Sequence, residues 1–223
     1  MNILVDIDAI GHFLSRWDEF TKIEKILHRD IQTFADRFGT YEPGDEGLSL
    51  HLVGRSAIRA FFAYVEAWVY QLKQLVLTAP IEDKLLTVGE VQILKEQEYQ
   101  LGDSGQLKLR PARLGLVPNF KFTLRIFARV FEVQREDPFT ASGFESFKML
   151  IVARDRLMHP KSLDDITNVM KDVGTLLDAL NWFEIVVKDI YRAGGWNYAN
   201  EAMRQPGTMN MFRGQPWQPK ADG

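Results

Sequence analysis

At 223 residues with 46% hydrophobic content, the chain can bury one sizeable core, and we expect a single helical domain over residues 1–200. It has no cysteine and four histidines without an HExxH spacing, so we expect neither disulfides nor a metal or cofactor site. The N-terminal run carries acids instead of a basic leader, and no apolar stretch approaches the roughly 20 residues that cross a bilayer. These features predict a cytoplasmic protein without a membrane partner.

The net charge of −3 is unevenly distributed along the chain. Residues 104–131 carry six basic residues and no acid, so the rest of the chain sums to −9. Within that stretch Lys121, Arg125 and Arg129 are spaced by four and would form one ridge on a helix. Such a ridge suits a polyanion, and we name these residues as candidate RNA contacts. The alternative is a solvated basic face that pairs with acids elsewhere in the chain.

Apolar periodicity predicts a first helix over about residues 8–38 and a second over about 49–77. Glu66 lies among the hydrophobic residues of the second helix, either as the partner of an arginine or at the edge of the apolar stripe. A capping box at Thr87 opens a short helix to about residue 97. Alternating residues around Gly102–Gly105 then predict a small β-hairpin.

The second half of the chain is also predicted to be helical. We predict a helix that follows Pro118 and Asn119 and runs to about residue 133, and another that a capping box opens at Ser142. A last long helix should run from about residue 164 to 191, and Gly194 with Gly195 should end regular structure. Residues 201–223 form a tail rich in Gly, Pro and Gln. The fold class is therefore all-α, a bundle of five or six long helices with one hairpin insertion.

Known phosphate-binding and catalytic loops are missing from the sequence. It contains no GxGxxG, GxSxG or P-loop, so dinucleotide enzymes, α/β-hydrolases and P-loop nucleotide hydrolases find no support.

The most informative segment is residues 154–160, Arg-Asp-Arg-Leu-Met-His-Pro. Arg154 continues an apolar helical stripe, where an arginine is paired, placed at an interface or kept for a ligand. His159 follows just before the helix-ending Pro160. Metal-free cleavage of RNA needs a proton acceptor, a proton donor and a cation at the phosphate, which histidine and arginine can supply. Because one chain carries one copy of each residue, a two-fold homodimer would complete such a site.

Arg154, the polar Asp155 and His159 resemble the R-x(4–6)-H signature of the HEPN superfamily, and the string from Arg154 to Lys161 resembles its bacterial Arg-Asn-x-Leu-x-His-Pro-Lys form. The likeness covers about residues 50–190, including an early helix around residues 55–66. Here Asp155 stands where asparagine is frequent.

The resemblance implies a helical bundle that dimerises along the motif helices. It also implies metal-independent endoribonuclease activity in toxin–antitoxin, phage-defence or RNA-processing systems, with an antitoxin or nucleotidyltransferase as a further partner. Arg154 and His159 would be catalytic and Asp155 would support them, while Arg156 and Lys161 are candidate contacts to the RNA backbone. The alternatives are a non-catalytic nucleotide- or RNA-binding or protein-interaction module of the same type, a structural ion pair for Arg154, and a helix-end role for His159.

Overall fold

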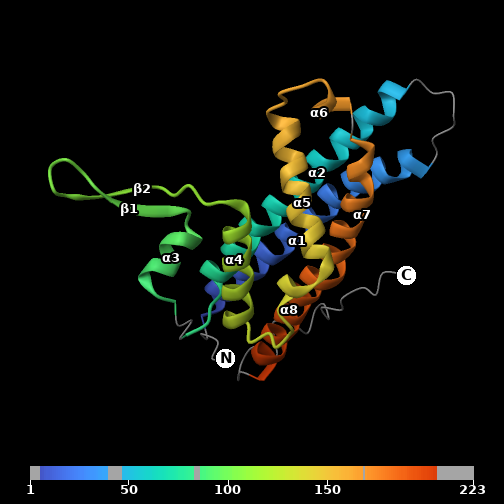
Figure 1. The fold of residues 1–223 in the computed structure, drawn as a ribbon. Coiled ribbons are helices and arrows are strands. Elements are labelled where there is room, and N and C mark those ends of the chain that lie inside the picture. The colour runs from blue at the N-terminus through green and yellow to red at the C-terminus, as the bar shows by residue number, and fades with distance from the viewer. Residues whose placement is uncertain (1–5, 40–46, 83–85, 168, 205–223) are drawn as a thin grey trace.

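The computed structural model describes residues 6–39, 47–82, 86–167 and 169–204. This part of the chain is mostly helical, with one two-stranded antiparallel sheet, which confirms the predicted fold class. The helices pack along one another and the sheet projects to one side (Figure 1). Residues 205–223 of the predicted tail lie outside the described residues. The prediction that the tail begins at residue 201 was wrong, because residues 201–204 are helical.

Two long helices form one side of the bundle. Helix α1 (Ile7–Gly39) packs along α2 (Gly47–Thr78), and both agree with the predicted ranges. The apolar stripe of α2 is buried because its members recur every three or four residues on one face. The buried residues of this stripe are Ile58, Phe61, Val65, Trp68, Leu72 and Leu75.

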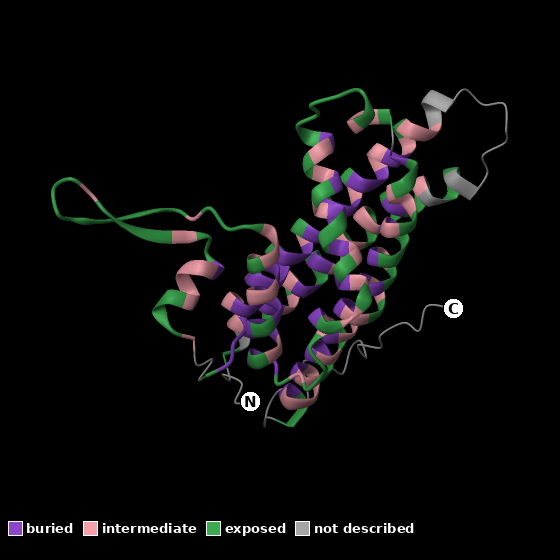
Figure 2. Ribbon diagram, in the orientation of Figure 1, coloured by how far each residue is buried: buried purple, intermediate pink, exposed green. Residues whose placement is uncertain are grey.

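After α2 come the short helix α3 (Val88–Leu94) and the hairpin of β1 (Gln97–Leu101) and β2 (Leu107–Pro111). Thr87 and Glu90 form the predicted capping box at the start of α3. The register pairs Tyr99 with Leu109 and Leu101 with Leu107, so one face of the hairpin is apolar. Both strands are almost wholly exposed (Figure 2).

Helix α4 (Leu116–Val130) is followed by the 3₁₀ turn η1 (Pro138–Thr140) and by α5 (Ser142–Met158). The prediction that Ser142 caps α5 was wrong, because Ala141 is the N-cap and no side chain bonds to the helix end there. Gly143 instead permits close packing, since a Cβ at this position would lie 2.2 Å from the Cβ of Trp182.

The predicted last helix is divided into several elements. These are α6 (Asp164–Thr167), the 3₁₀ turn η2 (Met170–Asp172), α7 (Val173–Trp182), the π-helical segment η3 (Phe183–Val187) and α8 (Lys188–Arg204). Before α6, the Ser162 N–H donates to the Asp165 carboxylate and the Asp165 N–H donates to the Ser162 hydroxyl oxygen.

The prediction that Gly194 and Gly195 end regular structure was also wrong, because both lie inside α8. A Cβ at Gly194 would lie 2.6 Å from a ring carbon of Phe127, and one at Gly195 would lie 2.7 Å from the Trp17 ring. The missing side chains therefore let α8 approach the aromatic core, where helix-packing distance outweighs the poor helix propensity of glycine.

Aromatic rings fill the centre of the bundle. Phe120 stacks on Phe183 at 6.0 Å between centroids, and Trp68 meets Phe183 edge to face at 5.5 Å. These contacts join α2, α4 and η3 and so fix the frame on which the polar sites described below are placed. Among the described residues, no helix combines the length and the hydrophobicity needed to cross a membrane.

Candidate functional site

Arg154 lies on the last turns of α5, on the side that faces α2. Its Nη2 donates to Oε1 of Glu66 at 2.7 Å, and its guanidinium lies 5.2 Å from the ring centroid of Phe62. Glu66 is thus the partner of this arginine, and with 49% of its side chain exposed it lies at the edge of the apolar stripe instead of being buried. The ion pair and the aromatic face hold the guanidinium in one orientation while 29% of the side chain stays exposed.

His159 is the first residue after α5, and its side chain is exposed. Its backbone N–H donates to the Asp155 carbonyl at 3.0 Å, while its own φ of −132° and ψ of 62° leave the helical region. Pro160 favours this change because a proline disfavours helical backbone at the residue before it. The imidazole therefore stands at the end of the helix in contact with solvent.

A single chain does not place Arg154 and His159 on one side of α5. Five positions on a helix of 3.6 residues per turn correspond to about 140° around the axis. Arg154 contacts Glu66 on α2, whereas His159 follows the exposed face of α5. The two groups therefore do not share one face of α5.

The neighbouring charged residues differ in their surroundings. Asp155 is exposed on α5, and Arg156 forms an ion pair with Asp172 at η2. Lys161 is exposed, and its backbone N–H donates to the carboxylate of Asp165 at 2.8 Å. That bond, together with those from Ser162, lowers the pKa of Asp165 and fixes the loop after Pro160.

The basic ridge of α4 has intramolecular partners. Arg125 pairs with Asp137 at 3.2 Å, Arg129 pairs with Glu90 at 2.9 Å, and the ammonium of Lys121 lies 4.7 Å from the ring centroid of Phe144. These contacts agree with the alternative reading, in which the ridge pairs with acids elsewhere in the chain. Its contact with RNA stays a prediction.

The exposed face of α5 carries more apolar surface than a solvated helix needs. Met149 is 63% exposed and Val152 is 67% exposed, and with Asp155 and His159 they follow a spacing of three, three and four. Met158 is exposed beside them. We call Met149, Val152, Asp155 and His159 the α5 face. A second subunit that packs against α5 would cover this face.

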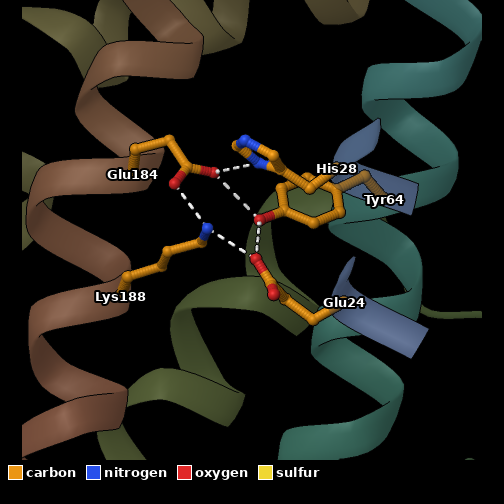
Figure 3. Close-up of polar contacts among 5 residues, drawn as sticks. All are labelled: Glu24, His28, Tyr64, Glu184 and Lys188. Atoms are coloured by element: carbon orange, nitrogen blue, oxygen red, sulfur yellow. Dashed lines mark hydrogen bonds and ion pairs between the residues drawn. The ribbon is translucent and has the colours of Figure 1, made fainter. Parts of the chain in front are cut away.

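A second polar group lies inside the bundle and was not predicted from the sequence. We call it the internal polar cluster; it comprises Glu24 and His28 of α1, Tyr64 of α2, Glu184 of η3 and Lys188 of α8 (Figure 3). Lys188 Nζ lies 2.5 Å from Glu24 Oε1 and 2.5 Å from Glu184 Oε2. The carboxylate of Glu184 also lies 3.2 Å from His28 Nδ1.

Tyr64 is the most deeply buried residue of this cluster, and its hydroxyl lies between the carboxylates of Glu24 and Glu184. The hydroxyl oxygen is 2.9 Å from Glu184 Oε1 and 3.1 Å from Glu24 Oε1. Burial raises the pKa of Tyr64, and the two acids raise it further, so the phenol stays neutral and donates a hydrogen bond.

The sequence holds a weak signal for this cluster. Glu24 with His28, and Glu184 with Lys188, are both four residues apart, so each pair shares one helix face. On a single helix this spacing is typical of solvated surface pairs. Only the packing of α1, α2 and α8 reveals that both pairs face the same point.

In comparisons with known proteins, no family model, no curated protein and no solved structure matches this chain.

Proposed function

We propose that this chain is the subunit of a homodimeric, metal-independent endoribonuclease of HEPN type, acting in a toxin–antitoxin, phage-defence or RNA-processing setting. The observation that carries the proposal is the end of α5, where an oriented, partly exposed guanidinium at Arg154 precedes a solvent-facing imidazole at His159. These are the two kinds of group that metal-free phosphodiester cleavage requires.

Arg154 would bind the scissile phosphate and stabilise the charge that develops on it. A guanidinium offers a permanent charge and a planar fork that fits two phosphate oxygens. Contact with Glu66 and Phe62 restricts the side chain before RNA arrives, which reduces the entropy lost on binding. One N–H of the guanidinium is already bonded to Glu66, so a phosphate would use the remaining N–H groups or displace that carboxylate.

His159 would transfer protons. A neutral imidazole can accept the proton of a ribose 2′-hydroxyl as that oxygen attacks the phosphorus. A protonated imidazole can donate to the leaving 5′-oxygen. One subunit supplies one imidazole, so the second proton-transfer group would be His159 of the other subunit in a two-fold dimer.

The α5 face supports this assembly. Met149 and Val152 expose apolar side chains two to three turns before His159, where a symmetry-related α5 would bury them and bring the two His159 side chains together. In that arrangement Asp155 would lie near the dimer axis and orient the catalytic groups, as the HEPN resemblance implies.

The test is cleavage of single-stranded RNA by the purified protein and by two variants, His159→Ala and His12→Ala. Loss of a general acid–base group lowers the rate by about 100-fold or more, so His159→Ala should be inactive while keeping its circular dichroism and oligomeric state. His12 is exposed on α1 and is the matched control. A His159→Ala protein as active as the wild type would rule out this mechanism.

A second candidate is the same dimer acting as an RNA- or nucleotide-binding module without turnover. The observation that favours it is the ion pair between Arg154 and Glu66, because a carboxylate that neutralises the guanidinium reduces the charge available to a transition state. RNA binding that is lost in Arg154→Ala, with no cleavage product from the wild-type protein, would select this module.

A further inference from the structure

The internal polar cluster lies on a different side of the molecule's central helix from the motif. Tyr64 and Glu66 are two positions apart on α2, which places them about 200° apart around the axis. Tyr64 faces α1 and η3 (Figure 3). Glu66 instead faces α5, where it accepts from Arg154. The cluster is therefore independent of the proposed nuclease site and calls for its own explanation.

The cluster is built to hold positive charge. Two carboxylates, from Glu24 and Glu184, meet at one ammonium, so the three groups carry a net charge of −1. The Tyr64 hydroxyl has a single hydrogen and lies within bonding distance of both carboxylates, but it can donate to only one of them at a time. The single ammonium thus leaves one negative charge of the two carboxylates unbalanced and some of their oxygens without a donor. A divalent cation would balance both charges and bind these oxygens.

The donor atoms are also of the right kind. Among the described residues, Glu24, His28 and Glu184 each offer one oxygen or nitrogen, and these atoms lie within 4.8 Å of one another. Around a tetrahedral ion with bonds of about 2.0–2.2 Å, ligand atoms stand about 3.3–3.6 Å apart, so the three donor atoms would draw together by up to about 1.5 Å on binding. Two carboxylates with one imidazole suit Zn²⁺, Mn²⁺ or Fe²⁺.

The protein around these atoms positions them and leaves a way in. Glu24 and His28 share one face of α1, and the π-helical turns of η3 carry Glu184 toward them. Such π turns recur at functional sites. Tyr64 is fully buried and orients the carboxylates, in the manner of groups that surround metal ligands. His28 and Glu184 each keep 25% of the side chain exposed, so an ion could reach them from solvent.

We propose that Glu24, His28 and Glu184 form a binding site for a divalent transition-metal ion, and that Lys188 is an internal cation that competes for it. The ammonium occupies the space between the carboxylates, and a bound metal ion would displace it. The lysine stem has four carbons, and its side chain is already 10% exposed, so the ammonium can move toward solvent. Binding to the wild-type protein is then weakened by this competition, and removal of the ammonium strengthens it.

The test uses the full chain and two probes, Mn²⁺ followed by electron paramagnetic resonance and Zn²⁺ followed by calorimetry. The wild type should bind one ion, and Glu184→Gln should weaken binding at least tenfold. Glu19→Gln removes an exposed carboxylate on α1 and should leave the affinity unchanged. Lys188→Met should bind at least tenfold more tightly than the wild type, with one ion per chain.

A purely structural salt bridge gives the opposite results. No binding by the wild type at millimolar Mn²⁺ or Zn²⁺, or binding that Glu184→Gln leaves unchanged, would overturn the site. Equal affinities of Lys188→Met and the wild type for the metal ion would show that the Lys188 ammonium does not compete with it. If Lys188→Met is unfolded without metal, the same comparison is made with Lys188→Gln, and His28→Ala in the wild-type background tests the nitrogen ligand. None of these results depends on cleavage of RNA.

Discussion

Glycine residues decide how closely the helices of this protein approach one another. Gly194 faces Phe127, and Gly195 faces Trp17, at distances that leave no room for a methyl group without movement of a ring. Both aromatic rings belong to the packed centre of the bundle, where other rings hold them on several sides. The fit of α8 against α4 and α1 thus depends on two missing side chains.

We expect Gly194→Ala to destabilise the protein by about 1–3 kcal/mol, because overpacking forces side chains out of their preferred positions. The measurement is the midpoint of thermal unfolding followed by circular dichroism. Gly174→Ala is the matched control, since a Cβ there meets no atom within 4 Å, and it should be neutral or stabilising by up to about 1 kcal/mol. Equal midpoints for the two variants would show that α8 can move away at no cost.

Sequence reasoning succeeded at single residues where a residue type conflicts with its pattern. Arg154 interrupts an apolar stripe, which predicts a paired arginine, an interface or a ligand, and the structure shows the first of these in Glu66. It failed at Gly194 and Gly195, because a glycine pair has the same one-dimensional signature whether it ends a helix or admits a neighbouring ring. Only the identity of the residues across the interface distinguishes these cases.

At the scale of elements, α3 is tied to α4 by one carboxylate. Glu90 accepts from Arg129 at 2.9 Å and from the backbone N–H of Thr87 at 2.8 Å, and these bonds, the one from Arg129 foremost, lower its pKa. The same residue therefore closes the capping box and joins two helices.

This arrangement predicts a dependence of stability on pH. Since the pKa of Glu90 is lower in the folded than in the unfolded state, its contribution is complete above the unfolded pKa of about 4.3. It is lost as pH falls through the lower folded value. We expect Glu90→Gln to be less stable than the wild type at pH 7, and the difference in free energy of unfolding to shrink below about pH 4. Urea unfolding at several pH values measures it, and a constant difference would contradict the assignment.

Elements with strong local signals could be predicted, and those that depend on packing could not. The capping box at Thr87, the hairpin and the two long N-terminal helices follow from spacing alone. The division of residues 164–204 into α6, η2, α7, η3 and α8 does not, because 3₁₀ and π turns arise where core packing overrides the regular helical hydrogen-bond pattern. The internal polar cluster was missed for the same reason.

At the scale of the whole molecule, the proposed function requires two copies of the chain. We expect the protein to be a dimer in light scattering, and Val152→Asp to convert it to a monomer, because the change buries a charge in the proposed interface. The monomer should also lose RNA cleavage. Ile26→Asp is the matched control, an equally exposed apolar residue on α1, and it should stay dimeric. A monomeric wild-type protein that cleaves RNA would contradict the shared site.

The π turns of η3 have a consequence for the comparison of related chains. Hydrogen bonds from residue i to i+5 accommodate one more residue than the regular pattern, so the helix before η3 and the helix after it are out of phase by about 100°. A related chain lacking one residue between positions 183 and 187 would keep an unbroken helix, but the residues before and after the deletion would be rotated by about 100° relative to each other, so the glutamate and the lysine would not both keep their places against α1. A one-position gap in an alignment of this segment would therefore distinguish related chains that keep the internal polar cluster from those that have lost it.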